Sequence, residues 1–184
     1  LNVSQDHMDR YVSIDSYAEV KAHVYKNSKV AVINKDDDYV KDMASANEFI
    51  SGFTLHEPVN NEYGLKEIKG QTWLCKGPQK LISKDQLKIK GMHNVADALA
   101  ALALGEAVSL PLEAMLSTLK TFGGLPHRTQ WIANKYDADW YNDSKGTNVG
   151  ATVAAINGLE VTNKIILIAG GLAKDADFSP LGDA

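Results

Sequence analysis

The chain has 184 residues, of which 45% are hydrophobic and 23% charged, so it can bury one large or two small cores and is not a disordered chain. Its net charge is −4, with lysines interspersed among carboxylates, and this pattern argues against a nucleic-acid or membrane partner. A single cysteine, Cys75, and the lack of any apolar run near the roughly 20 residues that span a bilayer predict a cytoplasmic protein.

The amino-terminal part is predicted to contain a helix, a buried strand and the start of a second helix. Apolar residues at helical spacing predict a helix over residues 14–26, with Ser13 as its cap and Lys21 near its inner stripe. The β-branched run 29–34 predicts a strand. The three aspartates at 36–38 then suit the positive end of a helix.

Residues 64–90 have a different pattern, in which apolar and polar residues alternate. Turn sequences at residues 70–71 and 77–78 divide this segment into short pieces. We therefore expect a small antiparallel meander there.

Two helices are expected after the meander. The first follows Gly91, and its inner stripe is formed by Val95, Leu99 and Leu102. The second begins with Pro111 at its first helical position and ends at Gly123-Gly124, where glycine commonly terminates a helix.

A domain boundary is predicted near residue 124, where the composition changes. Beyond it, strand-like segments around Trp131 and Trp140 begin a new αβ pattern. The continuous apolar run 164–169 predicts a parallel strand buried on both faces. Gly170-Gly171 would lie at the carboxyl end of this strand, where ligands bind in open α/β sheets.

Three polar clusters are candidates for chemistry: Asp6-His7, residues 91–94 and residues 142–148. Taken singly, each has an ordinary structural explanation. Asn94 can cap a helix, and His7 can be a surface residue at a helix start. The third cluster can form a turn.

Taken together, the motifs resemble those of the Mur ligases, and most of all the branch that adds D-glutamate. The resemblance runs from Leu1 to about Pro180. It is carried by five motifs that occur in family order: the run Leu1 to Arg10, Gly91-Met92-His93-Asn94, Gly124-Leu125-Pro126-His127-Arg128, Asn142-Asp143-Ser144-Lys145 and Gly170-Gly171.

The resemblance implies an α/β fold divided between two domains. Residues 1–123 would be the carboxyl-terminal part of a P-loop-type central ATPase domain that includes the meander. Residues 124–184 would begin a Rossmann-like carboxyl-terminal ligase domain. No G-x-x-x-x-G-K-[ST] pattern occurs in the sequence, so we expect the P-loop before Leu1, both ends to be internal to a longer protein, and the chain alone to be inactive.

Family roles in metal binding fall on His7 and Lys21. His7 would help to hold Mg²⁺, a cation that prefers oxygen ligands. Lys21 would be carbamylated, which converts its ammonium group into an anionic pair of oxygens. From the residues alone, Lys21 also reads as a lysine that snorkels from the edge of a helix.

Family roles in ATP binding fall on four residues. Asn94 would hydrogen-bond adenine, since an amide both donates and accepts. Asp97 occupies a position where the family often has asparagine, and an ionised carboxylate can only accept there. Arg128 would reach phosphate and Asp143 the ribose hydroxyls.

Lys145, Thr147 and Lys174 match positions that hold the incoming D-glutamate. The implied reaction transfers the γ-phosphoryl group of ATP to the carboxylate of UDP-N-acetylmuramoyl-L-alanine, and the amine of D-glutamate then attacks the acyl phosphate. The resemblance implies a monomeric, cytoplasmic enzyme of peptidoglycan synthesis that uses ATP and Mg²⁺.

Three alternatives remain open. The chain could belong to another amide ligase, either of the folylpolyglutamate synthetase type or a Mur ligase that adds a different amino acid. It could be a non-catalytic nucleotide-binding fragment. A dinucleotide-dependent oxidoreductase is disfavoured because no G-x-G-x-x-G follows either apolar strand.

Overall fold

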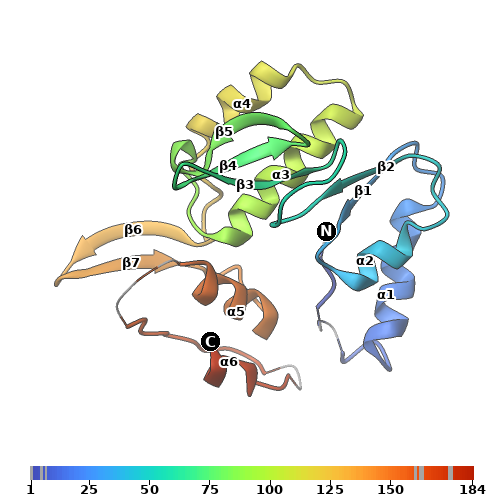
Figure 1. Ribbon diagram of the computed structural model, residues 1–184. Helices are drawn as coiled ribbons and strands as arrows, with labels where there is room; N and C mark the ends of the chain where they lie inside the picture. Colours follow the sequence, from blue (N-terminus) through green and yellow to red (C-terminus); the bar gives the residue numbers. More distant parts are fainter. Residues whose placement is uncertain (1, 5, 7, 160, 162–163, 174–175) are drawn as a thin grey trace.

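A five-stranded mixed sheet lies at the centre of the protein, with its strands in the order β1-β2-β3-β4-β5 (Figure 1). The computed structural model describes residues 2–4, 6, 8–159, 161, 164–173 and 176–184. The strands of this sheet are β1 (Ala31–Asn34), β2 (Ile50–Phe53), β3 (Tyr63–Ile68), β4 (Gln71–Lys76) and β5 (Gln79–Ser83). Helix α3 (Met92–Ala107) packs against β1, β2 and β3.

The predicted first helix is shorter than expected. Helix α1 (Ile14–Ala22) is capped by Ser13 and gives way to a 3₁₀ turn over His23–Tyr25. Lys21 is exposed, and its Nζ lies 5.1 Å from the centroid of the Tyr17 ring. The prediction that Lys21 lies near an inner stripe is wrong, because α1 fully buries only Ala18 and its face around Lys21 is exposed.

Strand β1 is buried on both faces, as its apolar run predicts, although it begins at Ala31. Ala31 and Ile33 pack with residues of α2 (Asp38–Met43) in a small core, whereas Val32 belongs to the main core. Helix α2 begins where the aspartates predict. Asp37 caps it, with Oδ1 accepting the N–H of Val40 at 3.0 Å.

The predicted meander is confirmed as β3, β4 and β5, which pair antiparallel. The sequence did not predict that it continues the sheet of β1. The unpredicted strand β2 makes this connection, pairing parallel with β1 over its whole length and with β3 at Phe53 and Tyr63. Cys75 is a fully buried thiol in β4, and burial raises its pKa, as expected of a core residue.

Both helices predicted after the meander are present. The stripe of Val95, Leu99 and Leu102 on α3 is buried in the main core. In α4 (Leu112–Thr121), Pro111 is the cap and not the first helical residue. Throughout the described ranges, no helix combines the length and the apolar character needed to cross a bilayer.

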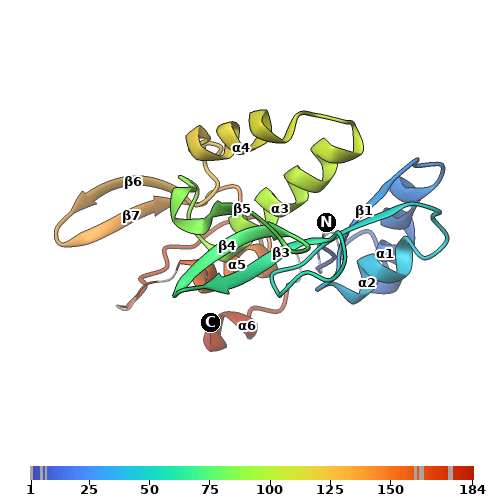
Figure 2. The same ribbon diagram turned by 45° about the horizontal axis from the view of Figure 1, so that its top comes forward.

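The chain after residue 124 forms a hairpin and two helices. Strands β6 (Gln130–Lys135) and β7 (Ala138–Asn142) pair antiparallel and project away from the main sheet (Figures 1 and 2). Tyr136 and Asp137 both have φ 57° at the turn, as a tight hairpin requires. Helices α5 (Val149–Gly158) and α6 (Pro180–Asp183) contact each other.

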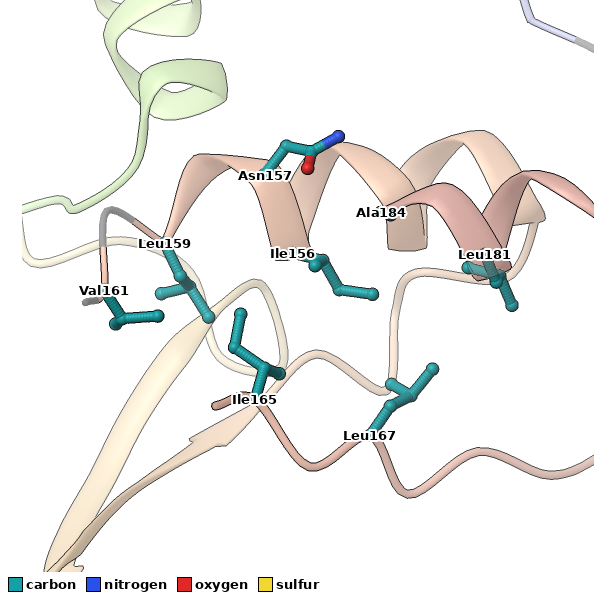
Figure 3. A pocket seen from close by; sticks show the side chains of 8 residues that line it. All are labelled: Ile156, Asn157, Leu159, Val161, Ile165, Leu167, Leu181 and Ala184. Atoms are coloured by element: carbon teal, nitrogen blue, oxygen red, sulfur yellow. The ribbon is translucent and has the colours of Figure 1, made fainter. Parts of the chain in front are cut away.

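The strand predicted over residues 164–169 is not formed. None of the described residues pairs with this run, and Ile166 and Ile168 are 87% and 82% exposed. Ile165 and Leu167 instead line a pocket beside α5 together with other, mostly apolar, residues (Figure 3). A continuous apolar run becomes a buried strand only where neighbouring strands and helices cover it, and the described chain supplies too few. The eight lining residues are Ile156, Asn157, Leu159, Val161, Ile165, Leu167, Leu181 and Ala184.

We expect Leu99→Ala to lower the free energy of unfolding by about 2–5 kcal/mol, because it opens a cavity in the main core. Leu99 is 0% exposed. Leu104→Ala is the matched control on the same helix, since Leu104 is 50% exposed, and should cost less than about 1 kcal/mol. Urea denaturation of both variants measures the difference, and equal losses would contradict this placement of α3.

Candidate functional site

The three polar clusters of the sequence meet at the loop that joins β7 to α5. This loop spans residues 142–148 and ends at Asn148, the cap of α5. The amino-terminal segment reaches it from one direction and the start of α3 from another. Segments more than 80 residues apart in the chain therefore contribute to one region.

The amino-terminal segment contacts the start of α5. Nδ2 of Asn148 lies 3.2 Å from Oδ2 of Asp6 and donates to it, while Oδ1 of Asn148 caps the helix by accepting the N–H of Ala151 at 2.8 Å. A Cβ on Gly150 would lie 3.2 Å from Cβ of Ser4, so the two backbones approach closely. This places Asp6 beside the third cluster, whereas His7 lies outside the described residues.

The first turn of α3 is held by glycines around the His93 ring. Gly91 adopts φ 93°, which L side chains rarely do, and this allows the chain to enter the helix. A Cβ on Gly158 would lie 2.3 Å from Nδ1 of His93. The ring is therefore enclosed between the start of α3 and the end of α5.

A short series of polar contacts leads from Asn94 to Asp143. Nδ2 of Asn94 lies 3.1 Å from Nε2 of His93, which lies 3.1 Å from Oγ1 of Thr129. The backbone N–H of Thr129 donates to Oδ1 of Asp143 at 2.7 Å. His93 and Thr129 thus lie between Asn94 and Asp143, the two residues to which the family resemblance assigns nucleotide contacts.

Thr129 has a backbone conformation that is unusual for a β-branched residue. Its φ of 41° lies in the left-handed region, which costs of order 1–3 kcal/mol unless the surroundings hold it. The carboxylate of Asp143 supplies such a restraint by accepting the N–H of Thr129. Asp143 is in turn held in a turn, since its C=O accepts the N–H of Gly146 at 2.8 Å.

Asp97 and Arg128 face this region from opposite sides of residue 124. Although Asp97 is exposed, desolvation by the surrounding protein raises the pKa of its carboxyl, and the charge of Arg128 opposes this rise. Arg128 is exposed and free to reach an anion in the adjoining space.

Lys145 and Thr147 are exposed in the loop just before α5. The N–H of Lys145 donates to the C=O of His127 at 3.1 Å, which ties this loop to the segment after residue 124. A helix N-terminus carries partial positive charge and favours carboxylates. Two side chains and a helix end are thus available to an anion here.

Lys21 is the predicted site residue that the described structure does not bring to this region. Lys21 lies on α1, over Tyr17, and no described contact links it to the loop. Lys174 lies outside the described residues. Within the described ranges, no three His, Cys, Asp or Glu residues are grouped as a metal site would require.

Sequence reasoning missed the roles of His93, Thr129 and Asn148 in assembling the site. His93 stood within a motif, yet only the fold shows that its ring is shared by three segments. Nothing in the sequence indicated the left-handed backbone of Thr129, because that conformation is typical of glycine and asparagine. Asn148 was readable as a helix cap but not as a contact of Asp6.

The mixed sheet and the helices packed on it place this protein among the α/β proteins, and comparison with known proteins identifies its family. The sequence profile of the Mur ligase middle domain matches residues 1–105. The UDP-N-acetylmuramoylalanine–D-glutamate ligase of Nitrosococcus oceani is 55% identical over 98% of the chain, and that of Pseudomonas aeruginosa is 44% identical over 98%. The chain belongs to the Mur ligase family.

Solved structures have the same fold. MurF from Acinetobacter baumannii superposes on 83% of the chain with a TM-score of 0.66 at 22% identity, and the chain covers 34% of that structure. MurC from Thermotoga maritima superposes on 85% of the chain with a TM-score of 0.62 at 19% identity, and the chain covers 36% of it. The chain spans 40% and 41% of the lengths of the Nitrosococcus and Pseudomonas relatives.

We expect Asp97→Asn to stabilise the chain at pH 7. The raised pKa means that the folded protein accommodates the ionised carboxyl less well than the unfolded chain does, so ionisation costs stability above the folded pKa. The gain should shrink as the pH falls towards the unfolded value of about 3.9, and it should vanish below that value, where both states are protonated. Urea midpoints measured from pH 4 to pH 7 test this pH dependence.

Asp139→Asn is a control for which we expect the opposite change in stability. Hydrogen bonds from Asn134 and Trp131 lower the pKa of the Asp139 carboxyl, so its ionised form favours the folded state. This variant should be less stable than the parent chain at pH 7. If Asp97→Asn also destabilises at pH 7, desolvation is not the dominant influence on the Asp97 carboxyl.

Proposed function

We propose that the protein containing this chain ligates D-glutamate to UDP-N-acetylmuramoyl-L-alanine at the expense of ATP, in the cytoplasmic synthesis of peptidoglycan. The relatives of 44–55% identity bear the name of this ligase. The observation that carries the proposal is that Asp6 contacts the loop before α5 directly, and that the start of α3 is linked to this loop through Thr129. The proposal concerns the whole protein, since the chain spans about two-fifths of those relatives.

In this proposal the chain contributes parts of two domains. Residues 1–123 complete a P-loop-type central ATPase domain, and residues 124–184 begin a Rossmann-like carboxyl-terminal domain. The segment from Phe122 to Thr129 contains no helix or strand, which suits a connection between domains. Gly124, with φ 90°, supplies a backbone conformation open mainly to glycine.

ATP would be held from both sides of residue 124. Asn94 and Asp97 come from the start of α3, and Arg128 and Asp143 from the segment beyond. The guanidinium group of Arg128 would pair with phosphate, and Asp143 would accept hydrogen bonds from the ribose hydroxyls. Because Oδ1 of Asp143 already accepts from Thr129, its other oxygen is the one available to ribose.

D-Glutamate would bind against the loop before α5. Its two carboxylates need cationic and hydroxyl partners, and Lys145 and Thr147 offer both at a helix N-terminus. Lys174 would complete this set. These three assignments rest on the family resemblance and on the exposure of Lys145 and Thr147.

Mg²⁺ would be held by His7 and by Lys21 as a carbamate, together with residues outside this chain. The described residues do not by themselves fit a magnesium site, because Lys21 lies over Tyr17 with no carboxylate cluster beside it. When bound, the metal would offset phosphate charge.

The reaction would proceed through an acyl phosphate. The carboxylate of UDP-N-acetylmuramoyl-L-alanine attacks the γ-phosphorus of ATP and releases ADP, and the amine of D-glutamate then attacks the acyl carbon. The tetrahedral intermediate expels phosphate and forms the amide. An acyl phosphate hydrolyses if water reaches it, so closure of the domains around the loop would protect it.

A different amide ligase is the second candidate, and it is disfavoured. The MurF and MurC structures are only 22% and 19% identical to the chain. The relatives named for D-glutamate addition are 44–55% identical.

We expect the whole protein to release phosphate from ATP only when UDP-N-acetylmuramoyl-L-alanine and D-glutamate are both present, and to form the amide product. L-Glutamate, with the opposite configuration at its α-carbon, should not replace D-glutamate. Phosphate release and product mass measure this. Equal turnover of another amino acid would contradict the proposed substrate.

We expect Asp143→Asn to weaken ATP binding by the whole protein about ten- to a hundredfold, because it removes the charge that accepts from ribose and restrains Thr129. Asp137→Asn on the hairpin turn is the matched control, since Asp137 is exposed and tolerates asparagine at φ 57°. Calorimetric titration with ATP compares the two. An unchanged affinity in Asp143→Asn would remove Asp143 from the nucleotide site.

A further inference from the structure

We propose that His93 is a positioning residue that locks the side-chain amide of Asn94, so that the site selects a purine with a 6-amino group. This inference rests on the proposed function, because it assumes that Asn94 meets the base. It adds a residue that contacts no substrate and sets which group of Asn94 is offered to the base.

The orientation of the Asn94 amide follows from its neighbour Lys90. The backbone C=O of Lys90 lies 2.7 Å from the amide atom assigned as Nδ2. A carbonyl oxygen only accepts hydrogen bonds, so the atom at this distance is the nitrogen. One of the two amide hydrogens is therefore used within the first turn of α3.

The second amide hydrogen of Asn94 is directed at His93. Nδ2 of Asn94 lies 3.1 Å from Nε2 of His93, which must accept and so carries no proton. The contact with Thr129 also fits a His93 ring without a proton on Nε2. The Thr129 hydroxyl lies 3.1 Å from Nε2 and can donate either to this nitrogen or to Asp143. A proton on Nε2 would instead set two N–H donors against each other.

The other ring nitrogen does not decide between the tautomers. Nδ1 of His93 is buried and has no hydrogen-bond partner among the described residues, so either tautomer leaves it unsatisfied. Gly91 and Gly158 pack against this side of the ring, where no Cβ could be accommodated without movement. The ring is thus fixed by packing on one edge and by hydrogen bonds on the other.

With both hydrogens engaged, Asn94 has only its carbonyl oxygen to offer a ligand. Such an acceptor matches the 6-amino group of adenine and opposes the 6-oxo group of hypoxanthine or guanine. An unlocked amide could rotate and donate to the oxo group. His93 therefore sets base selectivity without touching the base.

The test compares ATP with inosine triphosphate, ITP, as substrates of the whole protein. We expect His93→Leu to lower the ratio of kcat/KM for ATP over ITP roughly tenfold, mainly through KM. His93→Gln, whose side-chain carbonyl can still accept from Asn94, should retain most of the ratio. His23→Leu, at an exposed histidine beyond α1, is the matched control and should leave the ratio unchanged.

A second measurement needs no activity. A long-range ¹H–¹⁵N spectrum of the histidines in the 184-residue chain should show the His93 proton on Nδ1. A proton on Nε2, or an unchanged ATP/ITP ratio in folded His93→Leu, overturns the inference. If His93→Leu does not fold, the tautomer in the unmodified chain decides. Lack of ATP-dependent ligation by the unmodified whole protein would instead overturn the proposed function, and the tautomer would still be read separately.

Discussion

The carboxylate of Asp143 accepts the backbone N–H of Thr129 at 2.7 Å, and the arrangement of the candidate site depends on this bond. Thr129 has a left-handed backbone that a β-branched residue adopts only under restraint. In that conformation its hydroxyl reaches the ring of His93. Two contacts through Thr129 thus join the loop before α5 to the start of α3.

The packing of α3 on the sheet explains why the start of this helix lies close to Thr129. Strand β1 is covered on both faces, and α3 packs across β1, β2 and β3 through the buried stripe that includes Leu99. This packing fixes the helix axis, while Gly91 and Gly158 allow the His93 ring to fill the space between α3 and α5. The same helix, α3, therefore contributes both to the main core and to the candidate site.

Much of the fold could be predicted from the sequence, because its strongest signals are local. Hydrophobic patterns predicted the positions of β1, the meander and α3, and glycine and proline residues predicted where elements end. Strand β2 was missed because Ile50–Phe53 is only four residues long and contains Gly52, which is unfavourable within a strand. The run 164–169 was predicted as a strand because its pattern shows hydrophobicity but not whether another layer covers it.

The candidate site could be predicted less completely. Family motifs supplied Asn94, Arg128 and Asp143, but their meeting depends on long-range contacts that no local pattern encodes. The prediction that Lys21 lies on an inner stripe failed because helical spacing does not tell how much of a short helix is covered. His93 and Thr129 emerged only from the geometry.

The contact between His93 and Thr129 can be measured directly by nuclear Overhauser effects in the isotope-labelled 184-residue chain. We expect a cross-peak between the imidazole of His93 and the side chain of Thr129, comparable with that between the rings of Tyr11 and Tyr17, whose centroids are 5.0 Å apart. That cross-peak would confirm that α3 and the segment beyond residue 124 build one site. Its absence, with the tyrosine cross-peak present, would show that the two halves of the proposed nucleotide site are separate in this chain.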